Sequence, residues 1–319
     1  MSSDLILSVL LIAGSYLLGA LPSAYLLGRA VKGIDIRKYG SGNVGISNVS
    51  SHVGRWWAVP LIFFDISVKG ILPVTLASDR VLGLGPWAEM GAGMASILGH
   101  NWAVWLKFSG GRGMATVLGV LAALYYPLVV LYGSTAGMAW MAVRVRKNPA
   151  YAALGASILT GFGIVLWVLD KPLWAVLLCP LFLAALLSGY AFMAVWGKTA
   201  HRVHDSALWW GVAALLMPAW SVVLAQPVQV TSLCLVFLGV TAAKRLLSNR
   251  GTGTGPEESV PLMRLVWNRL VFDRDINERR EWVYRSPEEE AAQKSRPSPG
   301  TGGATGAVPA RRDNIGRSQ

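Results

Sequence analysis

Apolar runs of membrane-spanning length alternate with short polar segments along most of this chain. The runs cover residues 5–28, 56–78, 87–106, 115–143, 151–169, 173–196, 207–225 and 228–243. A helix needs about 20 apolar residues to cross the roughly 30 Å of bilayer hydrocarbon. Each run therefore predicts a helix that crosses or enters a membrane, and the chain is predicted to be an all-α, polytopic membrane protein. The first run has no small-residue cleavage site and is expected to be a retained span.

The fourth run is expected to form two short helices instead of one span. It is longer than a single span requires, has Pro127 near its middle and carries basic residues at both flanks. Positive flanks stay on the cytoplasmic side, so the run should enter the membrane and return, with its hinge at Tyr126 and Pro127. The sequence then predicts nine helical segments, with the N-terminus outside and the C-terminus in the cytoplasm.

The polar segments divide the chain into four predicted parts. Residues 1–206 form a seven-helix membrane core, 207–247 an additional transmembrane hairpin, 248–285 a basic cytosolic segment and 286–319 a tail. The third part has apolar residues at helical spacing among arginines, which fits either an amphipathic helix on the membrane surface or an ordinary solvated helix. The tail is rich in Pro, Gly, Ala and Ser and is expected to be disordered.

Composition and charge limit the kinds of ligand and site that the chain is expected to have. The chain is 53% hydrophobic and 14% charged, with a formal net charge of +12. Most basic residues fall in short loops, a distribution that favours membrane topology and phosphate chemistry over nucleic-acid binding. Cys179 and Cys234 lie inside apolar runs, so neither a disulfide framework nor a zinc site is expected. Asp65 and Lys69 lie within the second span, one helical turn apart, and are expected to pair with each other.

The first candidate site is the loop YGSGNVGISN at residues 39–48. Its glycines allow the backbone to approach a ligand closely, and its small polar side chains supply neutral hydrogen-bonding groups. The candidate residues are Ser41, Asn43, Ser47 and Asn48. Taken alone, the same pattern also describes an ordinary turn-rich loop.

The second candidate site combines GHNW at residues 99–102 with FSGGRGMAT at residues 108–116, where an apolar helix begins. Consecutive glycines and an arginine before a helix start suit an anion, because backbone amides, the helix dipole and a guanidinium all favour negative charge. The candidates are His100, Gly110, Gly111, Arg112 and Gly113. The spacing is not that of the nucleotide P-loop, so a phosphate monoester is the predicted ligand.

The third candidate site is HRVHD at residues 201–205. His201 and His204 are three residues apart and would share one face of a helix, but a metal site would need a third ligand that the sequence does not supply. A general base or a phosphate-orienting group is the preferred interpretation, with Arg202 as a neighbouring cation. The alternative is a basic cluster at the membrane interface that serves topology alone.

These motifs together resemble the PlsY-type acyl-phosphate:glycerol-3-phosphate acyltransferases of bacteria. The resemblance is carried by LPSAYLLG at residues 21–28, DIRKYGSGNVGISN at 35–48, and the glycine-rich segments within 97–116, and it extends over roughly residues 5–205. It implies a seven-helix enzyme of the bacterial inner membrane with a cytoplasmic active site and no cofactor. Such an enzyme moves a fatty acyl group from acyl phosphate to the 1-hydroxyl of glycerol 3-phosphate, giving lysophosphatidic acid for phospholipid synthesis.

The resemblance also assigns residues. Ser41 and Asn43 match the family's first motif, and Arg112 stands where the family usually has a lysine. His201 falls at the family's His-Arg pair, so Ser41, His201 and His204 are the catalytic candidates. Arg55 and Arg202 join the glycine loops as candidates for phosphate binding, and the substrates act in contact with membrane lipid.

Several positions depart from the family pattern. The family's arginine falls at Ser51, with Arg55 one helical turn further on, and its serine after the fifth helix has no counterpart in residues 148–154. His204 replaces an asparagine. A rival alignment places Lys244 on the family's last basic segment, but Gly239 then occupies the histidine position.

Two other classes of function remain open from the sequence. A catalytically degenerate paralogue would bind ligands or serve as a scaffold subunit in phospholipid synthesis. A transporter for a phosphorylated anion would carry charged groups near mid-membrane, and apart from Asp65 and Lys69 the predicted spans lack them.

Overall fold

The computed structural model describes residues 3–125, 127–129, 206–247 and 262–273. Every regular element in these ranges is helical, which confirms the predicted all-α class for this part of the chain. The α-helices are α1 (Ser3–Gly19), α2 (Ser23–Lys32), α3 (Ile46–His52), α4 (Arg55–Phe64), α5 (Leu72–Ala77), α6 (Pro86–Asn101), an unlabelled helix (Met114–Tyr125), α10 (Ser206–Val223), α11 (Val228–Leu247) and α12 (Leu262–Trp267). Shorter turns are η1 (Ile36–Lys38) and η3 (Val104–Leu106), of the 3-10 type, and η2 (Asp65–Ile71) and η5 (Asn268–Phe272), of the π type.

Three helical stretches in the described ranges are long and apolar enough to cross a membrane. They are Ser3–Lys32, Arg55–Ala77 and Val228–Leu247, and the second is the continuous run α4–η2–α5. The Met114–Tyr125 helix forms the first half of the predicted split run. Residues 127–129 are also helical, whereas the rest of that run and the predicted spans at 151–169 and 173–196 lie outside the described residues.

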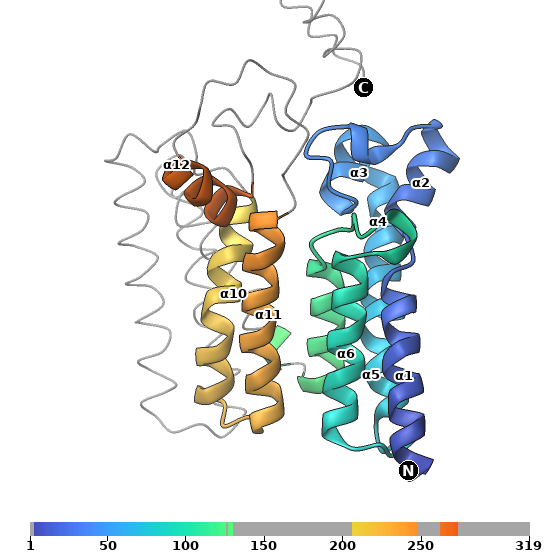
Figure 1. The fold of residues 1–319 in the computed structure, drawn as a ribbon, viewed down its shortest axis with the longest axis vertical. Helices are drawn as coiled ribbons and strands as arrows, with labels where there is room; N and C mark the ends of the chain where they lie inside the picture. The colour runs from blue at the N-terminus through green and yellow to red at the C-terminus, as the bar shows by residue number, and fades with distance from the viewer. Residues whose placement is uncertain (1–2, 126, 130–205, 248–261, 274–319) are drawn as a thin grey trace, which may run out of the picture.

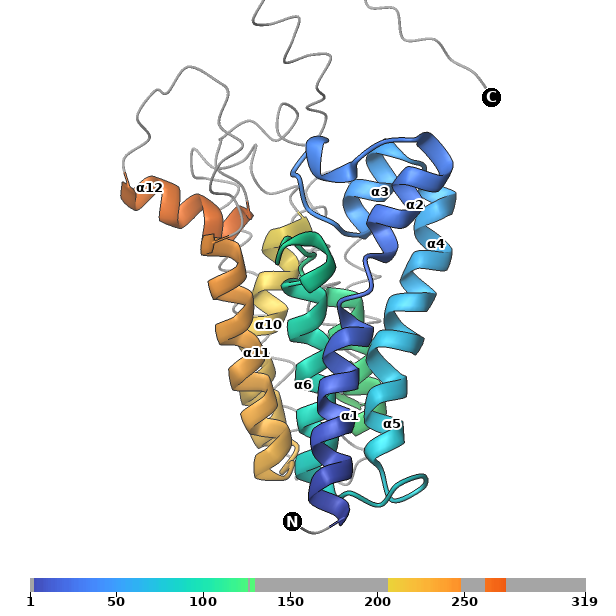
Figure 2. The same cartoon turned by 45° about the vertical axis from the view of Figure 1, so that its right-hand side comes forward.

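The long helices run side by side and leave the polar loops at one end (Figures 1 and 2). The N-terminus lies at the other end, together with the turn between α5 and α6 and the turn between α10 and α11. The segment from α2 to α3, the loop after α6 and α12 share the loop end. The described segments rich in Arg and Lys thus lie at one end of the bundle, an arrangement compatible with the alternation predicted from loop charge.

Glycines bring the first helices into backbone contact. A Cβ added at Gly19 would lie 2.1 Å from a backbone oxygen of α6, and one added at Gly99 would lie 2.1 Å from a backbone oxygen of α1. Gly70 and Gly119 meet in the same way, since a Cβ on Gly70 would lie 2.6 Å from the Cα of Gly119. Close packing of small residues drives helix association where lipid surrounds the protein, so these glycines fix the helix spacing.

The hairpin predicted at residues 207–247 forms α10 and α11 and packs into the same apolar core as the earlier helices. Met217 of α10 and Phe237 of α11 are fully buried in one cluster with Ile97 of α6 and Leu121 of the Met114–Tyr125 helix. Helices α10 and α11 therefore belong to the bundle that carries the glycine loops.

A buried ion pair ties the second span to the break between α1 and α2. Lys69 Nζ lies 3.0 Å from Asp65 Oδ1 and donates to the Leu21 carbonyl at 2.8 Å and to Ser23 Oγ at 2.9 Å. Each of the two charged residues is 1% exposed. The predicted pairing of Asp65 with Lys69 is confirmed, and the structure adds its partners on the first span.

Asp65→Asn should destabilise the protein by about 3 kcal/mol or more, because it leaves the Lys69 ammonium buried without its counter-charge. The double variant Asp65→Asn, Lys69→Met removes the uncompensated charge and should recover part of the loss. Thermal unfolding of purified protein in one detergent checks both variants. A single variant as stable as the wild type, or a double variant no better than the single, would contradict the assigned role of the pair.

Candidate phosphate-binding site

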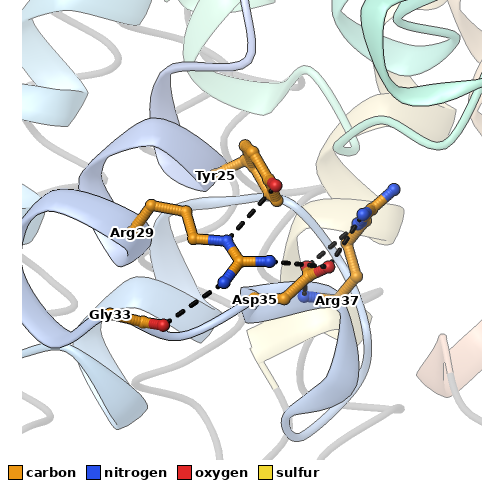
Figure 3. Close-up of polar contacts among 5 residues, drawn as sticks. All are labelled: Tyr25, Arg29, Gly33, Asp35 and Arg37. Carbon is orange, nitrogen blue, oxygen red and sulfur yellow. Dashed lines mark hydrogen bonds and ion pairs between the residues drawn. The ribbon is translucent and has the colours of Figure 1, made fainter.

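An ionic network fixes the entry to the first glycine loop (Figure 3). Asp35 accepts hydrogen bonds from Arg37 Nε at 2.9 Å and Nη2 at 2.7 Å, and from the Arg37 backbone N–H. Arg29 donates to the Tyr25 hydroxyl and the Gly33 carbonyl, and its Nη2 lies 3.9 Å from Asp35. Hydrogen bonding to the Arg37 side chain holds the pKa of Asp35 below its usual value, against the opposing effect of burial. Both arginines thus have partners within the chain.

Asn48 holds the first glycine loop from inside. Its side-chain Nδ2 lies 3.0 Å from the Ile36 carbonyl, 2.9 Å from the Tyr39 carbonyl and 3.1 Å from the Asn43 carbonyl, and the residue is 5% exposed. This amide is engaged with the loop backbone, so it determines the shape of the loop. Any part that Asn48 plays in ligand binding is exerted through that shape.

Ser41 and Asn43 lie together at the centre of the loop. The Ser41 hydroxyl accepts a hydrogen bond from the Asn43 backbone N–H at 3.3 Å. Asn43 Oδ1 is buried and has no hydrogen-bond partner within the part of the chain that the structure describes. Gly40 and Gly42 have φ values of 53° and 68°, in the left-handed region that favours glycine. The loop conformation thus depends on glycine at both positions.

The two glycine loops meet at Gly111. Its N–H donates to the His100 carbonyl at 3.0 Å, and an added Cβ would lie 2.2 Å from His100 Nε2 and 2.7 Å from the Val44 carbonyl of the first loop. A Cβ at Gly110 would lie 2.2 Å from the same His100 carbonyl. Only glycine fits at these two positions, and the sequence motifs separated by about 60 residues form one site.

His100 connects the site to the buried ion pair. Its Nδ1 lies 3.4 Å from Thr116 Oγ1 and 4.0 Å from Asp65 Oδ2, and the residue is buried. The ring therefore faces the hydroxyl and the carboxylate on one side and Gly111 on the other. Its environment is that of a group that positions the second glycine loop.

Asn101 is a site residue that the sequence analysis did not single out. It is 0% exposed, and neither its Oδ1 nor its Nδ2 has a hydrogen-bond partner among the described residues. A Cβ at Gly113, where φ is 69°, would lie 2.7 Å from Asn101 Oδ1. Buried amides are almost always hydrogen-bonded, so an unpaired amide beside the glycine loop is suited to contact a polar ligand. The sequence feature that could have identified Asn101 as a site residue is its position directly after His100 in the GHNW segment.

Arg112, the predicted phosphate ligand, binds a carboxylate of the same chain. Its Nε lies 2.7 Å from Asp273 Oδ2 and 2.9 Å from Oδ1, and its Nη2 lies 2.7 Å from Oδ1. Asp273 directly follows η5, and Lys244 of α11 also reaches the site by donating to the Asn101 carbonyl. The sequence analysis anticipated the affinity of Arg112 for an anion but assigned neither Asp273 nor Lys244.

The remaining predicted site residues are distributed differently. Gly113 directly precedes the Met114–Tyr125 helix, and Gly110 packs on the C-terminal end of α6. Ser47 and Arg55 are exposed, with Arg55 at the start of α4. His201, Arg202 and His204 lie outside the described residues, and their assigned roles stay predictions.

The fold and the site define an integral membrane protein with multiple helical spans and paired glycine loops around a fixed arginine. The sequence matches the family model described as glycerol-3-phosphate acyltransferase over residues 9–196. The chain belongs to this family of membrane acyltransferases.

Relatives extend the match beyond the family model. Glycerol-3-phosphate acyltransferase 4 of Dehalococcoides mccartyi is 32% identical over 284 residues, which cover 87% of this chain and 94% of the relative. A glycerol-3-phosphate acyltransferase of Gloeobacter violaceus is 38% identical over 50% of this chain and 77% of its own length. The crystal structure of PlsY, an integral membrane glycerol 3-phosphate acyltransferase, in its lysophosphatidic acid form has a TM-score of 0.49 and 24% identity over 78% of this chain and 95% of that chain.

Asp35→Asn should remove an acid-sensitive part of the stability. The folded-state pKa of Asp35 is lowered, so its pairing with Arg37 stabilises the fold above the unfolded carboxyl pKa of about 3.9 and is lost as the pH falls through the folded value. The wild type should therefore lose more stability than the variant between about pH 5 and pH 3. Thermal unfolding in detergent at a series of pH values measures this difference. Parallel curves for the two proteins would argue against the network.

Proposed function

We propose that this chain transfers a fatty acyl group from acyl phosphate to the 1-hydroxyl of glycerol 3-phosphate, producing lysophosphatidic acid. The observation that supports this function most directly is the meeting of the two glycine loops at Gly111, beside Arg112 and the unpaired amide of Asn101. Within an acyltransferase family, such a site has the donors needed to hold a phosphate next to a membrane.

The reaction requires no covalent intermediate with the protein, because acyl phosphate is already activated. The hydroxyl oxygen of glycerol 3-phosphate attacks the acyl carbonyl carbon, and the bond between that carbon and the phosphate oxygen then breaks. The phosphate leaves with the electron pair, and the hydroxyl proton passes to a base. The main contribution of the enzyme is to align two anionic substrates and to neutralise their charge.

The residues divide between these two tasks. Arg112 and the backbone amides of Gly110 and Gly113 bind a phosphate, while Ser41 and Asn43 orient the glycerol. The Gly111 amide, which the sequence analysis had included, instead donates to the His100 carbonyl and holds the loop in place. His201 or His204 accepts the hydroxyl proton, unless a substrate phosphate accepts it instead. Asn43 supports this division because its buried Oδ1 has no partner among the described residues and can accept a hydrogen bond from a substrate hydroxyl.

The site lies on the cytoplasmic face in this proposal. Arg29, Lys32, Lys107 and Arg112 belong to the segments at the loop end of the bundle, the end opposite the N-terminus. An excess of Lys and Arg marks cytoplasmic loops, so the N-terminus is outside and the polar tail inside. Residues 207–247 complete the bundle, 248–285 form a basic cytosolic segment, and 286–319 form a tail that the reaction does not require.

One observation favours a second function, that of a catalytically degenerate paralogue in phospholipid synthesis. Arg112 is paired with Asp273 of the same chain, and three positions of the family pattern are replaced. In this alternative the pair is permanent and the protein binds ligand or partner without turnover.

Arg112→Ala should lower kcat/KM for lysophosphatidic acid formation by roughly 10- to 100-fold, because it removes charge-assisted contacts to a phosphate. Deleting residues 286–319 should change kcat/KM little. Purified protein supplied with palmitoyl phosphate and labelled glycerol 3-phosphate provides the measurement, with Lys32→Ala as an exposed control.

Equal losses from Arg112→Ala and from the deletion would refute the assigned phosphate site. A folded wild-type protein that binds either substrate but forms no product would instead establish the degenerate paralogue.

A further inference from the structure

Two basic side chains from distant parts of the chain converge on the second glycine loop. Arg112 belongs to the loop, and Lys244 lies near the end of α11, where it is 4% exposed. Lys244 Nζ donates to the carbonyl of Asn101 and lies 5.3 Å from the centroid of the Trp102 ring. Lys244 also lies within electrostatic range of Arg112 and of Asp273. Two cations, Lys244 buried and Arg112 partly buried, thus share one region.

A carboxylate of the chain itself occupies this cationic region. Asp273 contacts Arg112 through both carboxylate oxygens, and its backbone is in the left-handed region with φ 54°. Two arginines hold the segment in place: Arg245 donates to the Leu270 carbonyl at 2.5 Å, and Arg269 donates to the Leu246 carbonyl at 2.9 Å. The end of α11 and η5 therefore present Lys244 and Asp273 to the loop as one unit.

The side-chain amide of Asn101 is a second indication of a bound ligand, independent of these charges. Asn101 is completely buried, and its Nδ2 and Oδ1 have no hydrogen-bond partner in the described part of the chain. Asp273 forms an ion pair with Arg112 but makes no hydrogen bond to this amide. A tetrahedral phosphate offers more acceptor oxygens than a carboxylate and carries close to two negative charges at neutral pH.

We propose that Arg112 and Lys244 are the two cations of one phosphate-binding site, and that Asp273 marks the position of the bound anion. Identifying that anion as the phosphate of glycerol 3-phosphate or of acyl phosphate rests on the proposed function. In this site the substrate displaces the Asp273 carboxylate, takes both cations as counter-charges and accepts a hydrogen bond from Asn101 Nδ2. Lys244 is then a substrate-binding residue that lies beyond the region matched by the family model.

Ligand-dependent thermal stabilisation of the full-length protein in detergent tests the site, with inorganic phosphate and glycerol 3-phosphate as probes. Lys244→Met should weaken the apparent affinity about 10-fold, and Lys244→Arg, which keeps the charge, should retain most of it. Asp273→Asn removes the internal competitor and should tighten phosphate binding by about threefold or more. Lys32→Met, an exposed lysine outside the site, is the matched control.

Two results would overturn the proposal. One is a Lys244→Met protein that binds phosphate as tightly as the wild type. If that protein also melts at a lower temperature, Lys244 only caps α6 and has no part in binding. The other is an Asp273→Asn protein that binds phosphate no more tightly than the wild type. The second test stands even if Lys244→Met fails to fold.

Activity measurements distinguish a failure of the proposed phosphate site from a failure of the proposed reaction. If binding depends on Arg112 and Lys244 but no lysophosphatidic acid forms, the phosphate site is supported and the acyltransferase function is rejected. If product forms and Lys244→Met leaves binding and both KM values unchanged, only the site is rejected. An increase in KM confined to glycerol 3-phosphate or to palmitoyl phosphate supports the site and identifies its substrate.

Discussion

The rest of the described structure depends on the buried ion pair between Asp65 and Lys69. Charges inside a membrane-spanning helix require a counter-charge and hydrogen bonds. The second span supplies both charges of the pair, but further hydrogen-bond partners come from the first span. Lys69 donates to the Leu21 carbonyl and to Ser23, where α1 ends and α2 begins, and Ser23 also donates to Asp65. The pair thus fixes the position at which the first helix breaks and the chain leaves the bundle to form the first glycine loop.

The same pair supports the second glycine loop through α6. Ser96 donates to the Lys69 carbonyl, and His100, one turn further along α6, faces Asp65 and Thr116. The His100 carbonyl in turn accepts the Gly111 N–H, where the loops meet. A short chain of polar contacts therefore connects the charges within the spans to the backbone that is proposed to hold a phosphate.

For the described part of the chain, the sequence contains enough information for the apolar helices, the loop end of the bundle and the pairing of Asp65 with Lys69. These features depend on local periodicity and on residues one helical turn apart. Contacts between residues far apart in the sequence could not be predicted from local patterns. Lys244 and Asn101 are 143 positions apart, and Arg112 and Asp273 are 161 apart. Nothing in the local pattern of α11 distinguishes Lys244 from a lysine that marks topology, and Asp273 lies in a segment whose pattern indicated only a basic helix. The predicted hairpin at residues 207–247 likewise carried no information on its packing against Ile97 and Leu121, because those contacts also join residues far apart in the sequence.

Charge balance at the loop end gives the site a preference among anions. With Lys244 protonated, Arg112 and Lys244 carry two positive charges and Asp273 carries one negative charge, so the cluster has a net positive charge in a largely buried region. An unbalanced buried charge is costly, and a dianionic phosphate monoester balances the two cations better than a carboxylate does. A monoanion such as a free fatty acid gains no such advantage over Asp273. In the proposed site the carboxylate would thereby disfavour fatty acids while still yielding to a phosphorylated substrate.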